Sequence, residues 1–126
     1  MEKQKNKIMI CDDSITSRKK LKECILKKDD FDIIEACNGT EAVNFYKTFM
    51  PHLVFMDIIM PFKDGTVATK EIIDLDKNAK IIILSSVGTK ENLKKTLTYG
   101  AIDFIQKPWN EMQIHNILEK LVLKGE

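Results

Sequence analysis

The sequence has few cysteines, and none of them is placed for a crosslink. Cys11, Cys24 and Cys37 are evenly spaced, odd in number, and contain no CxxC pair. This pattern excludes a disulfide framework and a cysteine-rich zinc site. We therefore expect buried, reduced thiols in a cytoplasmic protein.

Long apolar runs and a charge excess are also missing. The longest strongly apolar stretch, residues 53–62, is interrupted by Asp57 and is shorter than the about 20 residues that span a bilayer. Residues 8–11 are too short for a signal-peptide core. Twenty Lys and Arg oppose nineteen Asp and Glu, for a net charge of +1. This balance argues against a protein that coats nucleic acid or binds a membrane surface.

What remains is an ordinary globular composition, with 44% hydrophobic and 31% charged residues in 126 positions. That length predicts a single domain over residues 1–126. Apolar runs alternate with amphipathic stretches. The runs predict strands at residues 8–11, 31–36, 53–56, 80–84 and 103–106. The stretches predict helices at 14–28, 40–49 and 89–99, a helix after Gly65 ending near 75, and a last helix ending near 123.

Strands and helices in strict alternation form right-handed βαβ units, so we expect an α/β protein with a parallel sheet covered on both faces. Continuously apolar strands fit that burial. Ligands on such sheets bind at the carboxyl ends of the strands. These ends are therefore the place to look for a site.

Polar residues follow four of the five predicted strands. Asp12 and Asp13 follow the first strand, Asp57 the third, Ser85 the fourth and Lys107 the fifth. Three carboxylates that meet in one crevice need compensating charge. A hard cation with oxygen ligands, Mg²⁺ above all, would provide it.

Each residue also has a simpler explanation. The two adjacent acids favour a helix N-terminus, Ser85 can bond the local backbone, and Lys107 can be a surface lysine. Asp57 is harder to explain in this way, because an ionisable group inside Leu-Val-Phe-Met-Asp-Ile-Ile-Met is costly without a function. The argument rests on the whole set, since five coincidences at one sheet edge are improbable.

The ordered set resembles the response-regulator receiver domains of two-component signalling, of the stand-alone type used in chemotaxis. The resemblance covers about residues 7–122 and includes Met60-Pro61 and Asp64-Gly65 after Asp57, and Lys107-Pro108 near the end. It implies a doubly wound, flavodoxin-like, five-stranded parallel sheet in the order 2-1-3-4-5. It also implies a cis Lys107–Pro108 peptide bond. Trp109 and Ser86 depart from the common pattern, where Phe and a small apolar residue are usual.

The resemblance also implies a role for each site residue. Asp57 would be the phosphoacceptor. Mg²⁺ or Mn²⁺ would be held by Asp12, Asp13, Asp57 and the backbone carbonyl of Ile59. Lys107 would pair with the phosphoryl group, Ser85 would be the switch hydroxyl and Phe104 the switch aromatic. A permanent core residue is the alternative for Phe104.

The implied function is a phosphorylatable switch rather than a turnover enzyme. A histidine kinase or phosphotransfer protein would donate the phosphoryl group, in chemotaxis or another phosphorelay. The message would pass to a partner protein through the face formed by the fourth helix, fifth strand and fifth helix. Only 19 residues follow Lys107, so we expect no DNA-binding output domain.

Three other functions fit part of the pattern. A metal-dependent phosphohydrolase with an aspartyl nucleophile would want Asp-x-Asp on the first strand and a cap, whereas the acids here are adjacent. A flavin carrier would want hydroxyls and amides in its first loop, whereas Asp12-Asp13 repels a phosphate. A receiver fold that binds partners without phosphorylation is the third alternative.

Overall fold

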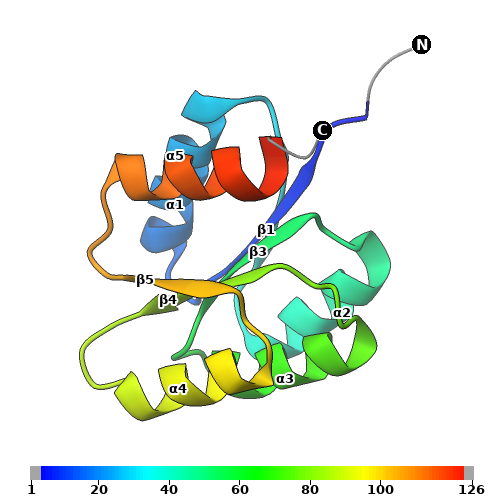
Figure 1. Cartoon of the computed structure of the whole chain (residues 1–126), viewed down its shortest axis with the longest axis vertical. Coiled ribbons are helices and arrows are strands. Elements are labelled where there is room, and N and C mark those ends of the chain that lie inside the picture. The colour runs from blue at the N-terminus through cyan, green and yellow to red at the C-terminus, as the bar shows by residue number, and fades with distance from the viewer. Residues whose placement is uncertain (1–3, 124–126) are drawn as a thin grey trace.

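The computed structural model describes residues 4–123, and five strands alternate with five helices along them (Figure 1). The ends of the predicted domain, residues 1–3 and 124–126, lie outside the described residues. The strands are β1 (Lys7–Cys11), β2 (Asp32–Ala36), β3 (Leu53–Asp57), β4 (Ile81–Ser85) and β5 (Asp103–Gln106). The helices are α1 (Ile15–Lys28), α2 (Gly39–Phe49), α3 (Gly65–Leu75), α4 (Lys90–Tyr99) and α5 (Glu111–Leu118), and a π-helical turn, Glu119–Leu123, follows α5.

The sheet is parallel throughout and has the order β2-β1-β3-β4-β5. Figure 1 shows α1 and α5 on one face and α2, α3 and α4 on the other. Successive residues of β3 point to opposite faces, so Val54 and Met56 enter one core while Leu53 and Phe55 enter the other. The predicted doubly wound α/β fold and its strand order are confirmed.

Local sequence signals explain where most helices begin. Side chains of polar residues just before four helices accept a hydrogen bond from a backbone amide of the first turn, and these capping residues are Ser14, Asn38, Asp64 and Asn110. The start of α4 is different. Thr89 occupies the cap position of α4, but its hydroxyl donates to the carbonyl of Ser86 and caps no helix amide. This hydroxyl therefore makes its hydrogen bond within the loop between β4 and α4.

The predicted boundaries are close to those observed. β4 begins one residue later than expected and includes Ser85, and β2 begins at Asp32. All three cysteines are free, and Cys11 and Cys24 are buried. The expectation of burial is wrong for Cys37, which is partly exposed just beyond the edge strand β2. Within residues 4–123, no helix combines the length and the apolarity that a membrane crossing requires.

Candidate functional site

The carboxyl end of β1 supplies two acids with different exposure. Asp12 is buried and its Oδ1 accepts a hydrogen bond from the backbone amide of Ser14, 2.9 Å away. Asp13 is exposed. Arg18 of α1 donates from Nη1 to the carbonyl oxygen of Asp12 at 2.7 Å. This contact fixes the backbone at the strand end and so holds both acids at the edge of the sheet.

Asp57 is the last residue of β3, a strand whose five residues are all buried. Its side chain keeps an exposed fraction of only 9%. One carboxylate oxygen from each of Asp12, Asp13 and Asp57 lies within 4.8 Å of the other two. The three carboxylates therefore converge at one edge of the sheet, as predicted.

Lys107 reaches this group from the end of β5. Its Nζ lies 3.1 Å from Asp12 Oδ2 and 3.1 Å from Asp57 Oδ2. The backbone amide of Lys107 donates to the carbonyl of Ser85 at 2.7 Å, which ties the ends of β4 and β5 together. The Lys107–Pro108 peptide bond is cis, as predicted. One ammonium thus bridges two buried carboxylates.

Burial and neighbouring charges shift the pKa values of both Asp57 and Lys107. Burial raises the pKa of Asp57 above its ordinary value, and Asp12 adds to the rise while Lys107 opposes it. Burial also disfavours the charge on Lys107, but the carboxylates of Asp57 and Asp12 outweigh this effect and raise the pKa of its ammonium. Both groups therefore hold protons more tightly than in water. A bound divalent cation would relieve this excess of negative charge.

The donor set fits Mg²⁺. Three carboxylates offer hard oxygen ligands on one side, and the exposure of Asp13 leaves room for the waters that Mg²⁺ keeps. Lys107 is the competing cation, because its ammonium already contacts two of the three acids. Metal and ammonium must share the same carboxylates.

We expect Lys107→Met to bind Mg²⁺ at least about tenfold more tightly than the unmodified chain, since repulsion between the ammonium and the metal is removed. Isothermal titration calorimetry measures this directly. Lys63→Met is a matched control, because the side chains of Lys63 and Lys107 are equally exposed and Lys63 pairs with Glu71 outside the site. Weaker Mg²⁺ binding by Lys107→Met would contradict the competition.

The structure places the two predicted switch residues differently. Ser85 is buried at the end of β4, one residue after Leu84, which pairs in register with Asp57. Phe104 lies on the edge strand β5 and is 42% exposed. The alternative of a permanent core position for Phe104 is therefore wrong. The side chain of Phe104 is partly open to solvent.

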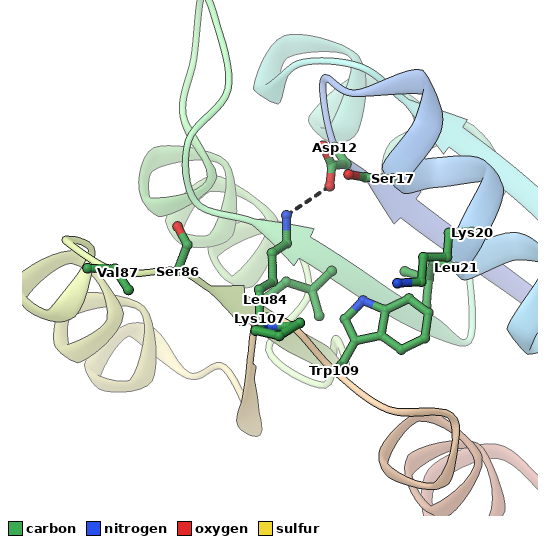
Figure 2. Close-up of a pocket in the computed structure, with 10 residues that line it drawn as sticks. Asp12, Ser17, Lys20, Leu21, Leu84, Ser86, Val87, Lys107 and Trp109 are labelled. Atoms are coloured by element: carbon green, nitrogen blue, oxygen red, sulfur yellow. Dashed lines mark hydrogen bonds and ion pairs between the residues drawn. The ribbon is translucent and has the colours of Figure 1, made fainter.

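A groove of about 450 Å³ opens beside the acids, between α1 and the loops after β4 and β5 (Figure 2). Trp109 forms one wall, and the ammonium of Lys20 lies 5.3 Å from the centre of its ring. Ser17 and Lys20 of α1 were not predicted to belong to the site. Their i, i+3 spacing on a helix that starts beside Asp13 is the signal that would have found them.

Two apolar side chains in the loops after β3 and β4 are exposed. Ile59 follows it by two residues and is 60% exposed, and Val87 lines the groove together with Asp12 and Lys107. Val87 is almost fully exposed. The rim of the site therefore presents methyl groups where a polar side chain could otherwise hold water.

Comparison with known proteins agrees with this geometry. Residues 8–119 match the family described as response regulator receiver domain. The chemotaxis protein CheY of Halobacterium salinarum is 39% identical over 116 residues, which cover 91% of this chain and 95% of that protein. CheY of Thermotoga maritima is 40% identical over 115 residues, covering 91% and 96%.

A solved structure of a CheY protein is also similar to this chain. In the crystal structure of the CheX–CheY–BeF3–Mg²⁺ complex from Borrelia burgdorferi, the matching chain is 33% identical to this one, with a TM-score of 0.83. The match covers 93% of this chain and 90% of that one. The similarity therefore extends over nearly the whole length of both chains.

Proposed function

The chain belongs to the response regulator receiver family, the phosphorylatable switches of two-component signalling, and on that premise we propose that Asp57 is its phosphoacceptor. The observation that carries the proposal is the environment of this carboxylate. Asp57 is buried at a strand end, within 4.8 Å of the oxygens of two other acids and 3.1 Å from an ammonium.

In the proposed reaction, a carboxylate oxygen of Asp57 attacks the phosphorus of a phosphohistidine on a kinase or phosphotransfer protein. An oxygen–phosphorus bond forms, the nitrogen–phosphorus bond breaks, and the histidine nitrogen keeps the electron pair. The transfer depends on positioning and on neutralising charge rather than on further covalent chemistry. Lys107 is placed to move its hydrogen bond from the Asp57 carboxylate to an oxygen of the incoming phosphoryl group.

The carboxylates of Asp12, Asp13 and Asp57 would hold Mg²⁺. The family resemblance adds the backbone carbonyl of Ile59 as a further ligand. A bound Mg²⁺ neutralises phosphoryl oxygens during transfer. The hydrogen bond from Arg18 would keep the backbone of Asp12 in place during the phosphoryl transfer.

The proposed output follows from the position of Ser85. A phosphoryl group on Asp57 presents oxygens that can accept a hydrogen bond from the Ser85 hydroxyl, and this would draw the loop before α4 toward the site. Phe104 would then move on β5. We propose that a downstream protein reads the resulting change on the face formed by α4, β5 and α5, in the cytoplasm, where three free cysteines stay reduced.

The test is incubation of the protein with acetyl phosphate and Mg²⁺, followed by intact-mass measurement. We expect one added phosphoryl group, its loss on treatment with hydroxylamine, which cleaves acyl phosphates, and no labelling with a metal chelator. Steady release of phosphate over many turnovers from simple phosphomonoesters would favour the phosphohydrolase alternative. A chain that takes no label but still binds its partners would favour an interaction module.

We also expect slow loss of the phosphoryl group. Hydrolysis needs a water held in line with the phosphorus, and neither Ile59 nor Val87 offers a polar group to orient one. Ile59→Asn and Val87→Glu should each speed the decay of the labelled protein, together by about tenfold or more. Phe62→Asn, an exposed change further along the loop after β3, is the control and should leave the decay unchanged. If the unmodified protein decays as fast as the double variant, these positions do not control the lifetime.

A further inference from the structure

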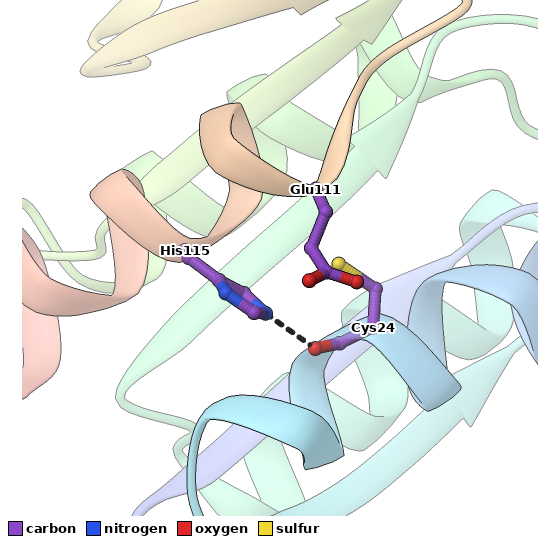
Figure 3. A group of neighbouring side chains, drawn as sticks. All are labelled: Cys24, Glu111 and His115. Carbon is purple, nitrogen blue, oxygen red and sulfur yellow. Dashed lines mark hydrogen bonds between the residues drawn. The ribbon is translucent and has the colours of Figure 1, made fainter.

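Three side chains with different ligand chemistry meet between α1 and α5, away from the acidic site. Cys24 comes from α1, and Glu111 and His115 project toward it from successive turns of α5 (Figure 3). One potential ligand atom from each residue lies within 4.8 Å of the other two. A sulfur, a nitrogen and an oxygen donor thus surround a single point.

One hydrogen bond and the spacing of two residues along α5 hold this arrangement in place. The imidazole Nε2 of His115 lies 2.8 Å from the carbonyl oxygen of Cys24, to which it donates a hydrogen bond. The i, i+4 spacing of Glu111 and His115 places both side chains on the same face of α5. The imidazole is therefore held against α1 beside the thiol, and the carboxylate lies one turn away on the same side.

We propose that Cys24, Glu111 and His115 form a binding site for a divalent transition metal ion with the ligand preferences of Zn²⁺. Thiolate, imidazole and carboxylate are the ligands that zinc accepts, in tetrahedral sites with water in the remaining position. Zinc–ligand bond lengths place neighbouring ligand atoms about 3.5 Å apart. The ligand atoms, which lie within 4.8 Å of one another, would have to move about 1 Å closer together.

The site is accessible, and its competing contacts are weak. A groove of about 260 Å³, lined in part by Cys24, Lys27 and Glu111, opens onto the thiol. Lys27 forms an ion pair with Glu111 at 3.0 Å, but both side chains are largely exposed, and such pairs contribute little. Burial keeps the Cys24 thiol protonated, so the metal has to displace a proton.

This site is independent of the phosphorylation chemistry. Cys24 lies nine residues after the first residue of α1, roughly 13 Å along the helix axis. The acidic site offers only oxygen atoms to a metal, whereas this one offers sulfur and nitrogen as well, so the two sites select different ions. A metal here would link α1 to α5 and so restrain one edge of the proposed output face.

The experiment uses the full-length reduced protein with excess Mg²⁺ present to occupy the acidic residues. Titration with Co²⁺ should produce a near-ultraviolet thiolate-to-metal charge-transfer band that saturates at one equivalent, and Zn²⁺ should displace it. Cys24→Ser should lose the band, and His115→Gln should bind Zn²⁺ at least about tenfold more weakly. Zn²⁺ should raise the melting temperature of the unmodified chain but not that of His115→Gln.

Matched variants separate this site from other metal ligands. Cys37→Ser removes the more accessible thiol, His52→Gln the other histidine, and Asp57→Asn an acid of the magnesium site, and all three should keep the band. Glu111→Gln, at an exposed position, tests the site without disturbing the core if Cys24→Ser does not fold. The proposal is overturned if the unmodified chain gives no band, if Cys24→Ser keeps it, or if Cys37→Ser removes it.

Discussion

Asp57→Asn is expected to abolish phosphorylation by acetyl phosphate while making the fold more stable at neutral pH. The amide has the shape of the carboxylate but is not a nucleophile, so no acyl phosphate can form. Intact-mass measurement should show no added phosphoryl group under conditions that label the unmodified chain fully. Asp64→Asn is the matched control, because Asp64 caps α3 and asparagine caps helices equally well. It should be labelled normally.

The gain in stability follows from the direction of the pKa shift. Burial raises the pKa of Asp57 above its ordinary value of 3.8, so the folded state favours the protonated form more strongly than the unfolded state does. This stabilising contribution is fully present below the unfolded pKa and is lost as the pH rises through the raised folded value. At neutral pH the ionised group therefore weakens the fold, and asparagine removes that cost.

Chemical denaturation as a function of pH measures this effect. Without Mg²⁺, the free energy of unfolding of Asp57→Asn should exceed that of the unmodified protein by on the order of 1 kcal/mol at pH 7, and the difference should shrink as the pH falls toward 4. Added Mg²⁺ should reduce this difference in unfolding free energy, because it binds and stabilises the carboxylate form of the unmodified protein. A variant that loses both label and stability would contradict this account, since misfolding would then explain the missing label.

Gly65→Ala is expected to cost about 3 kcal/mol or more of folding stability and to slow labelling of Asp57. Gly65 is the first residue of α3, and its amide donates to the carbonyl of Ile58 at 2.7 Å. A methyl group at this position would overlap the backbone carbonyl of Asp57 and lie 2.9 Å from the Cα of Ile58. Neither of these backbone atoms can rotate away, so the start of α3 has to move off the end of β3.

Gly88→Ala is the control that separates the two possible costs of replacing a glycine. One cost is a steric clash of the new methyl group, and the other is backbone strain at a positive φ. Gly88 has a φ of +93°, but nothing lies within 4 Å of the position that a methyl group would take. The expected cost there is only the backbone strain, about 1–2 kcal/mol. Thermal or urea unfolding compares the two variants. If Gly65→Ala is no less stable than Gly88→Ala, the contact between α3 and β3 is looser than described.

The sequence by itself determined the fold class and the members of the acidic site. Continuous apolar strands that alternate with amphipathic helices leave few topologies, because βαβ units have one hand and parallel strands bring their carboxyl ends to one edge. Asp57 stood out because it interrupts the apolar run of residues 53–62, where burying a charge is costly. The positions of Asp12, Asp13, Asp57, Ser85 and Lys107 relative to the strands followed from the same rules.

Only the tertiary structure decided how these side chains share charge and which other residues join them. That one ammonium contacts both Asp12 and Asp57 depends on the turn after β5, which strand patterns do not specify. The outward position of Phe104 depends on β5 being an edge strand. Cys24 and His115 are separated by 91 residues and meet only because α1 packs against α5. Periodicity shows which face of a helix is buried, but the partner of that face is fixed by packing in three dimensions.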